Sequence, residues 1–310
     1  MPFKMALFGA GKWARNIARA LTERGDVHIE AALVRDPSKP RDWLHGTPVY
    51  TDPSALLRKH ACDGAVICTP PATHSDFCIT ALEHGLPCFL EKPATLSLAE
   101  MKRIETAAMR AGLPVVVDYI HLHSVPFQRL VEETQRRGRP VKVIALAGNK
   151  EAAVRDCSIL WDWGAHDIAM AVACLGGVGA VPHQVDAWPA HTAAFDSIRL
   201  RLDWAGIPVH FRFSQELPRK ARAFCVQFQE EVFLYTDRPV HTLTRWPRGA
   251  AGRYRKASGE VLVQGGVNPL HAALDSFINK ARKRAVVRDD LSSSVEVTRI
   301  LELCDRQLAI

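Results

Sequence analysis

Short apolar runs alternate with helical patterns over the first 119 residues of the chain. The runs that predict strands span residues 4–8, 28–34, 64–68, 87–90 and 115–119. Helical patterns fill several of the intervals, and the clearest has Ser97 as its N-cap with Glu100 at the capping-box position. Strands that alternate with helices are typical of a doubly wound parallel sheet, so this part predicts an α/β domain.

The pattern changes after Tyr119. A predicted helix at 127–137 and a strand at 140–146 lead through a polar loop to a further helix, and helical patterns also close the chain. Between residues 183 and 264 apolar positions recur with a period of two, which predicts an antiparallel sheet with one wet face. We therefore expect a dinucleotide-binding Rossmann domain at 1–119, and at 120–310 an α+β domain with a large, mainly antiparallel sheet for substrate binding and oligomerisation.

A glycine turn joins the first predicted strand to the first helix. It has the pattern G-x-G-x-x-A and consists of Gly9, Ala10, Gly11, Lys12, Trp13 and Ala14. In such turns the first glycine permits the tight bend, and the second lets the backbone approach a pyrophosphate. The N–H groups at the start of the helix then face the phosphates. The turn predicts a dinucleotide site, and the alternative is a glycine-rich turn without a ligand.

The end of the second predicted strand indicates which dinucleotide is bound. An acidic residue here accepts hydrogen bonds from the ribose of NAD, whereas an arginine accommodates the 2′-phosphate of NADP. Val34 is apolar, Arg35 is basic and Asp36 follows one position later. This order favours NADP over NAD, unless Arg35 is only an exposed turn residue. A strand one residue longer would instead bring Asp36 to the ribose and favour NAD.

Polar residues also follow a later strand of this domain. Glu91 and Lys92 come directly after the strand at 87–90. Ligands of doubly wound sheets bind beyond the carboxyl ends of the strands. Lys92 is therefore predicted to face the cofactor crevice.

In the second half, the segment from Ser158 to Leu175 is the main candidate for chemistry. Its apolar spacing predicts an amphipathic helix on which Asp162 and His166, four residues apart, share one face. Gly164 lies between them and would leave room for a ligand on that face. A carboxylate beside an imidazole can orient the ring and make it a proton shuttle. The alternative is a helix-terminal carboxylate beside a hydrogen-bonded histidine.

Composition excludes several classes of function. The chain is 47% hydrophobic and 24% charged, and no apolar run approaches the roughly 20 residues of a membrane helix. No secretory signal is visible, and the 8 scattered cysteines form no C-x-x-C pair. We therefore expect no membrane association, no zinc site and a reducing, cytoplasmic location.

The chain has a formal charge of +7, and its 13 histidines form no ligand-spaced cluster, so we expect no metal. Its basic clusters lack the interleaved aromatic residues of a nucleic-acid platform, so we expect solvated surfaces and no nucleic-acid partner.

Together these residues resemble the Gfo/Idh/MocA oxidoreductases, the family of glucose–fructose oxidoreductase and inositol dehydrogenase. The resemblance covers nearly the whole chain and is carried by the glycine turn, by the tripeptide E-K-P at residues 91–93 and by D-x-G-x-H at residues 162–166. Residues 154–167 look most like the branch of sugar and nucleotide-sugar dehydrogenases. In one departure, Asp167 follows His166 directly, where the family often has H-x-x-D. In another, the loop at 148–155 resembles no single specificity.

The resemblance implies an enzyme that transfers hydride between NAD(P) and a secondary alcohol or ketone of a sugar, polyol or nucleotide sugar. Lys92 would assist proton transfer, His166 would be the principal acid/base or share that role with Lys92, and Asp162 would orient substrate and histidine. A cis peptide bond would precede Pro93, and a homodimer or homotetramer would form through the C-terminal sheet. The implied cofactor contacts beyond the glycine turn and Arg35 are Thr69, Pro70, His74, Glu91 and Lys92.

The sequence also offers candidates for the substrate pocket and leaves two alternative functions open. Besides Asp162 and His166, the candidates for the substrate pocket are Tyr119, His121, His123 and Arg155, with packing as an equal alternative for each. Some relatives hold NAD tightly and cleave a glycosidic bond by transient oxidation. A dinucleotide-sensing regulator would keep the fold without catalysis, but the intact Lys92, Asp162 and His166 argue against it.

Overall fold

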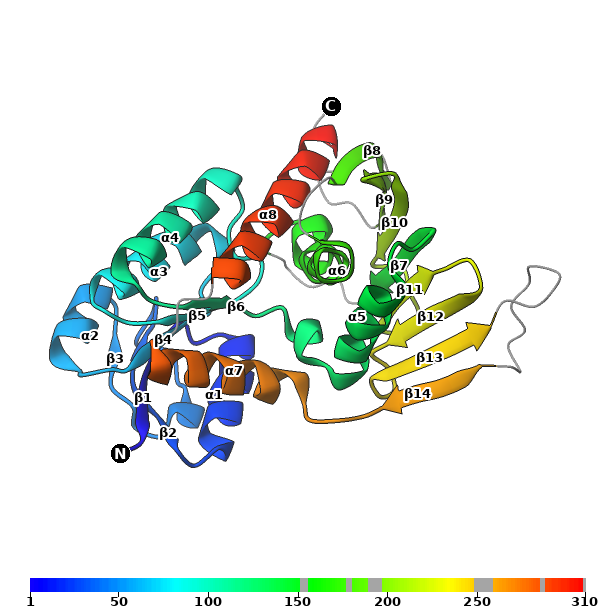
Figure 1. Ribbon diagram of the computed structural model, residues 1–310. Helices are drawn as coiled ribbons and strands as arrows, with labels where there is room; N and C mark the ends of the chain where they lie inside the picture. Colours follow the sequence, from blue (N-terminus) through cyan, green and yellow to red (C-terminus); the bar gives the residue numbers. More distant parts are fainter. Residues whose placement is uncertain (151–155, 177–179, 189–196, 248–258, 285–287, 309–310) are drawn as a thin grey trace. The chain divides into compact units, whose positions relative to one another are not determined.

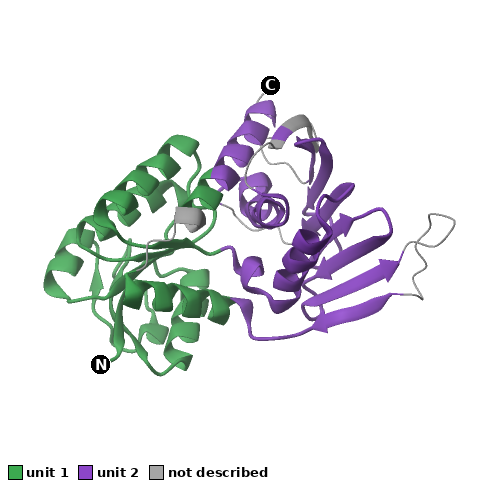
Figure 2. Cartoon of the chain, viewed as in Figure 1, with its two compact units in different colours: residues 1–118, 270–295 green, residues 119–269, 296–310 purple. Residues whose placement is uncertain are grey.

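The computed structural model describes residues 1–150, 156–176, 180–188, 197–247, 259–284 and 288–308. The chain divides into two compact units, shown in Figure 2: unit 1 comprises residues 1–118 and 270–295, and unit 2 comprises residues 119–269 and 296–310. The sequence placed everything after residue 119 in the second domain, whereas residues 270–295 group with unit 1. Long-range contacts hold this segment there, because Phe277 packs on Phe89 with ring centroids 5.7 Å apart and Asp275 pairs with Arg24.

Unit 1 is built on a six-stranded parallel sheet of order β3-β2-β1-β4-β5-β6 (Figure 1). Its strands are β1 (Phe3–Phe8), β2 (Val27–Leu33), β3 (Val49–Tyr50), β4 (Gly64–Ile67), β5 (Cys88–Leu90) and β6 (Val115–Val117). Its helices are α1 (Lys12–Glu23), α2 (Pro53–Lys59), α3 (His74–Glu83), α4 (Leu98–Ala111) and α7 (Pro269–Lys283). The strand order reverses between β1 and β4, which is where such sheets bind their ligands. The predicted Rossmann domain is confirmed.

Local sequence explains most of these elements. Every residue of β4 is buried, as expected for a parallel strand covered on both faces. The Ser97 hydroxyl accepts the Glu100 N–H at 3.2 Å and caps α4 as predicted. Gly112, with φ of 64°, ends the same helix in the left-handed region.

Unit 2 contains an eight-stranded sheet of order β14-β13-β12-β11-β7-β10-β9-β8. Its strands are β7 (Lys142–Gly148), β8 (Ala180–Trp188), β9 (Ser197–Trp204), β10 (Ile207–Ser214), β11 (Ala221–Gln227), β12 (Glu231–Thr236), β13 (Thr242–Pro247) and β14 (Glu260–Gln264). Its helices are α5 (Val125–Arg137) and α6 (Ile159–Leu175), and α8 (Arg288–Leu308) contributes its second part. The pair β7–β10 is parallel and the other neighbours are antiparallel, which confirms the mainly antiparallel sheet.

Helix α6 differs from the amphipathic helix that the sequence predicted. Almost all of its residues are buried, which is the behaviour of a helix inside a core. A Cβ atom on Gly164 would lie 3.2 Å from the Phe213 ring and 3.3 Å from Leu301. Gly164 therefore permits close packing of α6 inside unit 2, and the prediction that it leaves room for a ligand was wrong.

The structure also bears on the expectations for disulfides, membrane helices and metal sites. All eight cysteines are free thiols. Within the described ranges, no helix combines the length and apolar character needed to cross a bilayer. The same residues contain no cluster of three or more His, Cys, Asp or Glu side chains arranged to hold a metal ion.

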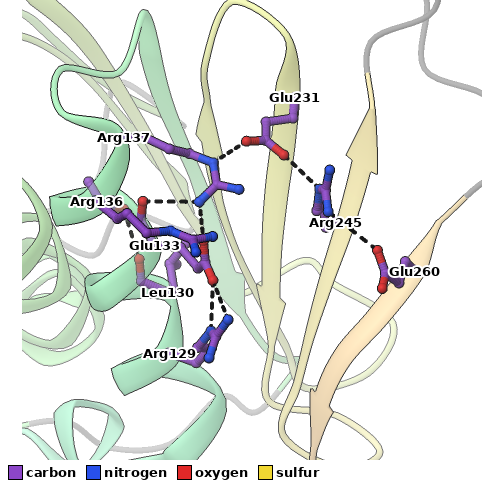
Figure 3. A network of polar contacts seen from close by, with 9 residues as sticks. Arg129, Leu130, Glu133, Arg136, Arg137, Glu231, Arg245 and Glu260 are labelled. Carbon is purple, nitrogen blue, oxygen red and sulfur yellow. Dashed lines mark hydrogen bonds and ion pairs between the residues drawn. The ribbon is translucent and has the colours of Figure 1, made fainter.

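A network of arginines and glutamates connects α5 to β12, β13 and β14 of the unit 2 sheet (Figure 3). Its centre is Glu133, which is buried and receives hydrogen bonds from Arg129, Arg136 and Arg137. Arg137 also pairs with Glu231, which continues the network across the β-strands. Burial acts to raise the pKa of Glu133, but the three arginine hydrogen bonds outweigh it and the pKa is lowered.

We expect Glu133→Gln to lower the free energy of unfolding by about 1–3 kcal/mol at pH 7, because three charge-assisted hydrogen bonds lose their acceptor charge. A lowered folded pKa stabilises the protein above the unfolded pKa of about 4.3, and this contribution disappears as pH falls through the folded value. Urea unfolding at pH 7 and at lower pH measures the difference between the two proteins. Glu132→Gln, on the exposed face of the same helix, is the control. An equal loss in both variants, or a difference that persists at low pH, would contradict this account.

Candidate functional site

The glycine turn of unit 1 contains two glycines that are required for different reasons. Gly9 has φ of +99°, and a Cβ atom there would lie 2.5 Å from the Cys68 carbonyl oxygen at the end of β4. This position therefore admits only glycine. A Cβ atom on Gly11 would meet nothing within 4 Å among the described residues. No described protein atom therefore excludes a side chain at position 11. A ligand that approaches the backbone there would explain why the residue is glycine.

The start of α1 is suited to an anion. Gly11 is the N-cap, and in the described structure no side chain caps the helix and no acidic residue occupies its first turn. The first N–H groups of a helix lack partners within it and carry a partial positive charge. The chain at this turn therefore fits the pyrophosphate of a dinucleotide. Lys12 and Trp13, in this first turn, are both exposed.

The end of β2 carries the three residues that the sequence analysis used to choose between NAD and NADP. Val34 is buried, and its N–H still donates to the Tyr50 carbonyl at 2.8 Å. Arg35 is exposed. The Asp36 carboxylate accepts hydrogen bonds from the Ser38 hydroxyl at 2.6 Å and from the Ser38 N–H at 3.0 Å, and these bonds lower its pKa. Asp36 is therefore engaged within its own turn.

His74 holds two loops of this sheet edge together. Its Nε2 lies 2.8 Å from the Thr69 carbonyl oxygen, and its Nδ1 lies 3.0 Å from the Pro93 carbonyl oxygen. The ring is buried, and burial lowers its pKa. Because both ring nitrogens face backbone carbonyls, His74 positions the loops of Thr69 and Pro93 and is not available for the cofactor contact that the sequence predicted. Thr69 is half-buried and Pro70 is exposed.

Lys92 stands at the end of β5, where the sequence placed it. It is half-buried, and the cis peptide bond expected before Pro93 is present. The Lys92 N–H donates to Glu91 Oε2 at 3.0 Å. Glu91 is buried, and so is Asp118, which directly follows the neighbouring strand β6. Burial, and then Asp118, raise the pKa of Glu91 well above its usual value.

Unit 2 contains a chain of polar side chains from the turn at residues 120–123, from β11 and β12, and from the residue before β13. Arg222 donates to His121 Nε2, and His121 Nδ1 lies 2.9 Å from the Tyr235 hydroxyl. Since a guanidinium can only donate, His121 Nε2 must accept and its Nδ1 carries the proton. The Tyr235 hydroxyl then donates to His241 Nδ1 at 2.7 Å. Burial, and then the charge of Arg222, lower the pKa of His121 well below its usual value, so His121 is neutral.

The helix that carries Asp162 and His166 borders this chain. His166 is buried, and its ring packs edge-on against His121 with centroids 5.0 Å apart. Asp167 is fully buried and pairs with Arg222 at 3.2 Å, and burial raises its pKa to about 6 despite that charge. Asp167, which departs from the family's spacing, is thus the counterion of a core arginine. Asp162 is half-buried.

The remaining predicted substrate contacts differ in their surroundings. Tyr119 is buried and His123 is half-buried. His121 has both ring nitrogens engaged with Arg222 and Tyr235, so it belongs to the core of unit 2. Arg155 lies outside the described residues.

The sequence analysis missed several buried polar residues. Asp118 directly follows β6, so the rule that identified Lys92 could have found it. Arg222 occupies an inward position of the alternating strand β11, beside Phe224 and Val226, where a charged residue requires a partner. Tyr235 and His241 carried no comparable signal, because their contacts with His121 and Ser124 join residues more than a hundred positions apart in the chain.

Comparison with known proteins adds a family match. Residues 3–119 match the model of the Oxidoreductase family, NAD-binding Rossmann fold, GFO_IDH_MocA. Inositol 2-dehydrogenase 2 of Saccharopolyspora erythraea is 27% identical over 186 residues, which is 57% of this chain and 55% of that protein. D-glucoside 3-dehydrogenase of Escherichia coli is 25% identical over 136 residues, which is 43% of this chain and 39% of that protein. The chain thus spans about half, or less, of the length of these two relatives.

A solved structure matches over the whole chain. UDP-N-acetylglucosamine 3-dehydrogenase of Acidithiobacillus ferrooxidans superposes with a TM-score of 0.83 and 19% identity, covering 100% of this chain and 99% of that one. At this identity the likeness establishes a shared fold.

Proposed function

We propose that the chain, whose residues 3–119 match the Gfo/Idh/MocA oxidoreductase family, is an NAD(P)-dependent dehydrogenase or reductase. Its substrate is a secondary alcohol or ketone on a sugar, polyol or nucleotide sugar. The observation that carries the proposal is the glycine turn, where Gly11 leaves open space at an uncapped helix start beside the switch point of the sheet. The two curated relatives, named for inositol and D-glucosides, support a ring polyol as substrate.

Two residues carry the proton chemistry in this proposal, and a third orients the substrate. When bound, NAD(P) supplies the nicotinamide that exchanges hydride with the substrate carbon. Lys92 gives a proton to the reacting oxygen or takes one from it, and its ammonium stabilises negative charge that develops there. His166 is the principal acid/base and Asp162 orients the substrate, as the resemblance implies.

One screen tests the proposed activity. Reduction of NADP⁺ and NAD⁺ is followed with a panel of inositols, free sugars, glycosides and nucleotide sugars, together with the reverse reaction on the corresponding ketones. Turnover of at least one ring polyol with a free cofactor is expected. Binding of cofactor without turnover of any compound would favour the regulator, and release of an aglycone without net cofactor reduction would favour the glycosidase.

For the cofactor we propose NADP, because Val34 offers no carboxylate to the ribose and Asp36 is engaged by Ser38. Arg35→Ala should weaken NADP⁺ binding by roughly 10- to 150-fold, since a hydrogen bond to a charged group contributes about 1.5–3 kcal/mol. NAD⁺ lacks the 2′-phosphate and should bind almost equally to both proteins. Fluorescence titration at one low ionic strength measures both affinities without variable screening.

Arg41→Ala serves as the matched control for Arg35→Ala. The Arg41 guanidinium donates to the Asp36 and Lys39 carbonyls at 2.9 and 2.8 Å, so it closes the same loop. Its removal should change both affinities together. A wild-type preference for NAD⁺, or an unchanged ratio in Arg35→Ala, would overturn the NADP assignment and leave the dehydrogenase proposal standing.

We further propose a homodimer or homotetramer that forms through the outer face of the unit 2 sheet. On this face Ile144 is 36% exposed, and Leu146, Cys225 and Leu234 are half-buried. Light scattering of the purified protein tests it, and a monomer at micromolar concentration would refute it.

The free cysteines support a cytoplasmic location, which cell fractionation would test.

A further inference from the structure

Four buried side chains of unit 2 form a closed circuit of contacts. His166 and Asp167 are neighbours on α6. Asp167 pairs with Arg222 of β11 at 3.2 Å, and Arg222 donates to His121 Nε2. The His121 ring then packs on the His166 ring, with centroids 5.0 Å apart and an interplanar angle of 89°. The exposed fractions are 0% for Asp167, 4% for Arg222, 5% for His121 and 8% for His166. The circuit therefore begins and ends on α6, and all of its members are shielded from solvent.

The orientation of the His121 ring is fixed at both of its nitrogens. A guanidinium can only donate, so Nε2 accepts from Arg222 and Nδ1 carries the proton. The Tyr235 hydroxyl lies 2.9 Å from Nδ1 and accepts this second hydrogen bond. Because both nitrogens are engaged, the contact with His166 is made by the face or by a carbon edge of the ring. His121 therefore packs on His166 and does not exchange a proton with it.

Stability alone does not explain the ion pair in this circuit. Removing two charges from water costs about as much as their attraction contributes, and apolar residues of similar volume often stabilise a core equally well. Arg222 nevertheless occupies an inward position of β11, where Phe224 and Val226 are its buried neighbours on the same face. The pair holds the guanidinium at a defined place, and the guanidinium in turn fixes one nitrogen of His121.

We propose that His121 is a positioning residue whose ring holds the His166 imidazole in the orientation needed for proton transfer. This inference rests on the proposed function, in which His166 is an acid/base. The perpendicular contact of the two rings is an arrangement that aromatic pairs prefer, so it restrains the rotation of His166. A displacement of about 1 Å in an active site can lower the rate roughly 10²-fold, so this restraint should have a large effect on kcat.

Two substitutions separate the ring of His121 from its hydrogen bonds. His121→Gln keeps an acceptor for Arg222 and removes the ring. His121→Phe keeps a ring against His166 and removes every hydrogen bond of the side chain, so it should be the less stable variant. If the ring positions His166, kcat should fall roughly 10- to 100-fold in His121→Gln and clearly less in His121→Phe. The order of activity should thus be opposite to the order of stability.

The measurements use the ring polyol that wild type turns over fastest in the screen. Steady-state rates give kcat, and they are normalised to the concentration of protein that binds NADP⁺, so that unfolded protein does not mimic a loss of rate. Thermal unfolding gives the order of stability. His28→Gln, which replaces an exposed histidine of β2, is the control and should leave kcat unchanged.

His166→Asn provides a second test, because a positioning residue acts only through the group that it positions. His121→Gln should lower kcat by no more than about twofold when residue 166 is already asparagine. A side chain that only supports the fold would lower kcat by the same factor in both backgrounds.

Three results would overturn the inference: unchanged kcat in folded His121→Gln, a lower kcat in folded His121→Phe than in His121→Gln, or equal losses in the two backgrounds. Unchanged kcat in His166→Asn would instead refute the acid/base role that the proposed function gives to His166. A wild-type protein that turns over no compound of the screen would refute the proposed function as a whole.

Discussion

Replacing Lys92 with methionine should lower kcat by roughly 10²–10⁴, the usual contribution of a positioned proton donor or acceptor. Methionine keeps the unbranched apolar stem of this half-buried side chain and removes only its ammonium. His166→Ala should have an effect of the same order. Steady-state rates on the substrate found by the screen measure both changes, and cofactor titration should show far smaller effects.

Two controls separate this chemistry from stability. Lys102→Met removes an exposed lysine of α4 and should leave kcat unchanged. Because His166 is buried and packs on the His121 ring, His166→Asn accompanies the alanine variant to limit the cavity. Near-full turnover in folded Lys92→Met or His166→Asn would show that the corresponding residue is structural.

Gly11→Val should abolish cofactor binding in a protein that remains folded. The backbone of Gly11 has φ of −82°, which valine adopts, and nothing in the described structure lies within 4 Å of the added Cβ. The new side chain would instead occupy the space in which a pyrophosphate approaches the backbone. Nicotinamide fluorescence measures the loss of binding, and circular dichroism with thermal unfolding measures the fold.

Gly9→Ala is the contrasting variant from the same turn. Its Cβ would lie 2.5 Å from the Cys68 carbonyl oxygen on a backbone with φ of +99°, so it should destabilise the protein before it affects any ligand. A stable Gly9→Ala protein would contradict the geometry of the turn. Unchanged affinity in a folded Gly11→Val protein would remove the dinucleotide hypothesis itself.

The sequence alone determined those features that depend on neighbours in the chain. Alternation of strands and helices identified the parallel sheet of unit 1, and the period of two from Ile198 to Phe213 identified the antiparallel one, because each period follows from backbone geometry. The cap at Ser97 and the bend at Gly9 were also predictable. Each depends on a hydrogen bond or a dihedral angle within a few residues.

Tertiary structure decided the features that depend on distant partners. The spacing of Asp162 and His166 is the same on an exposed helix and on a buried one, and only the sheet and α8 packed around Gly164 make α6 a core helix. Asp167 became the counterion of Arg222 for the same reason. Glu91 and Asp118 lie 27 residues apart in the chain, and folding buries both at neighbouring strand ends, which raises the pKa of each.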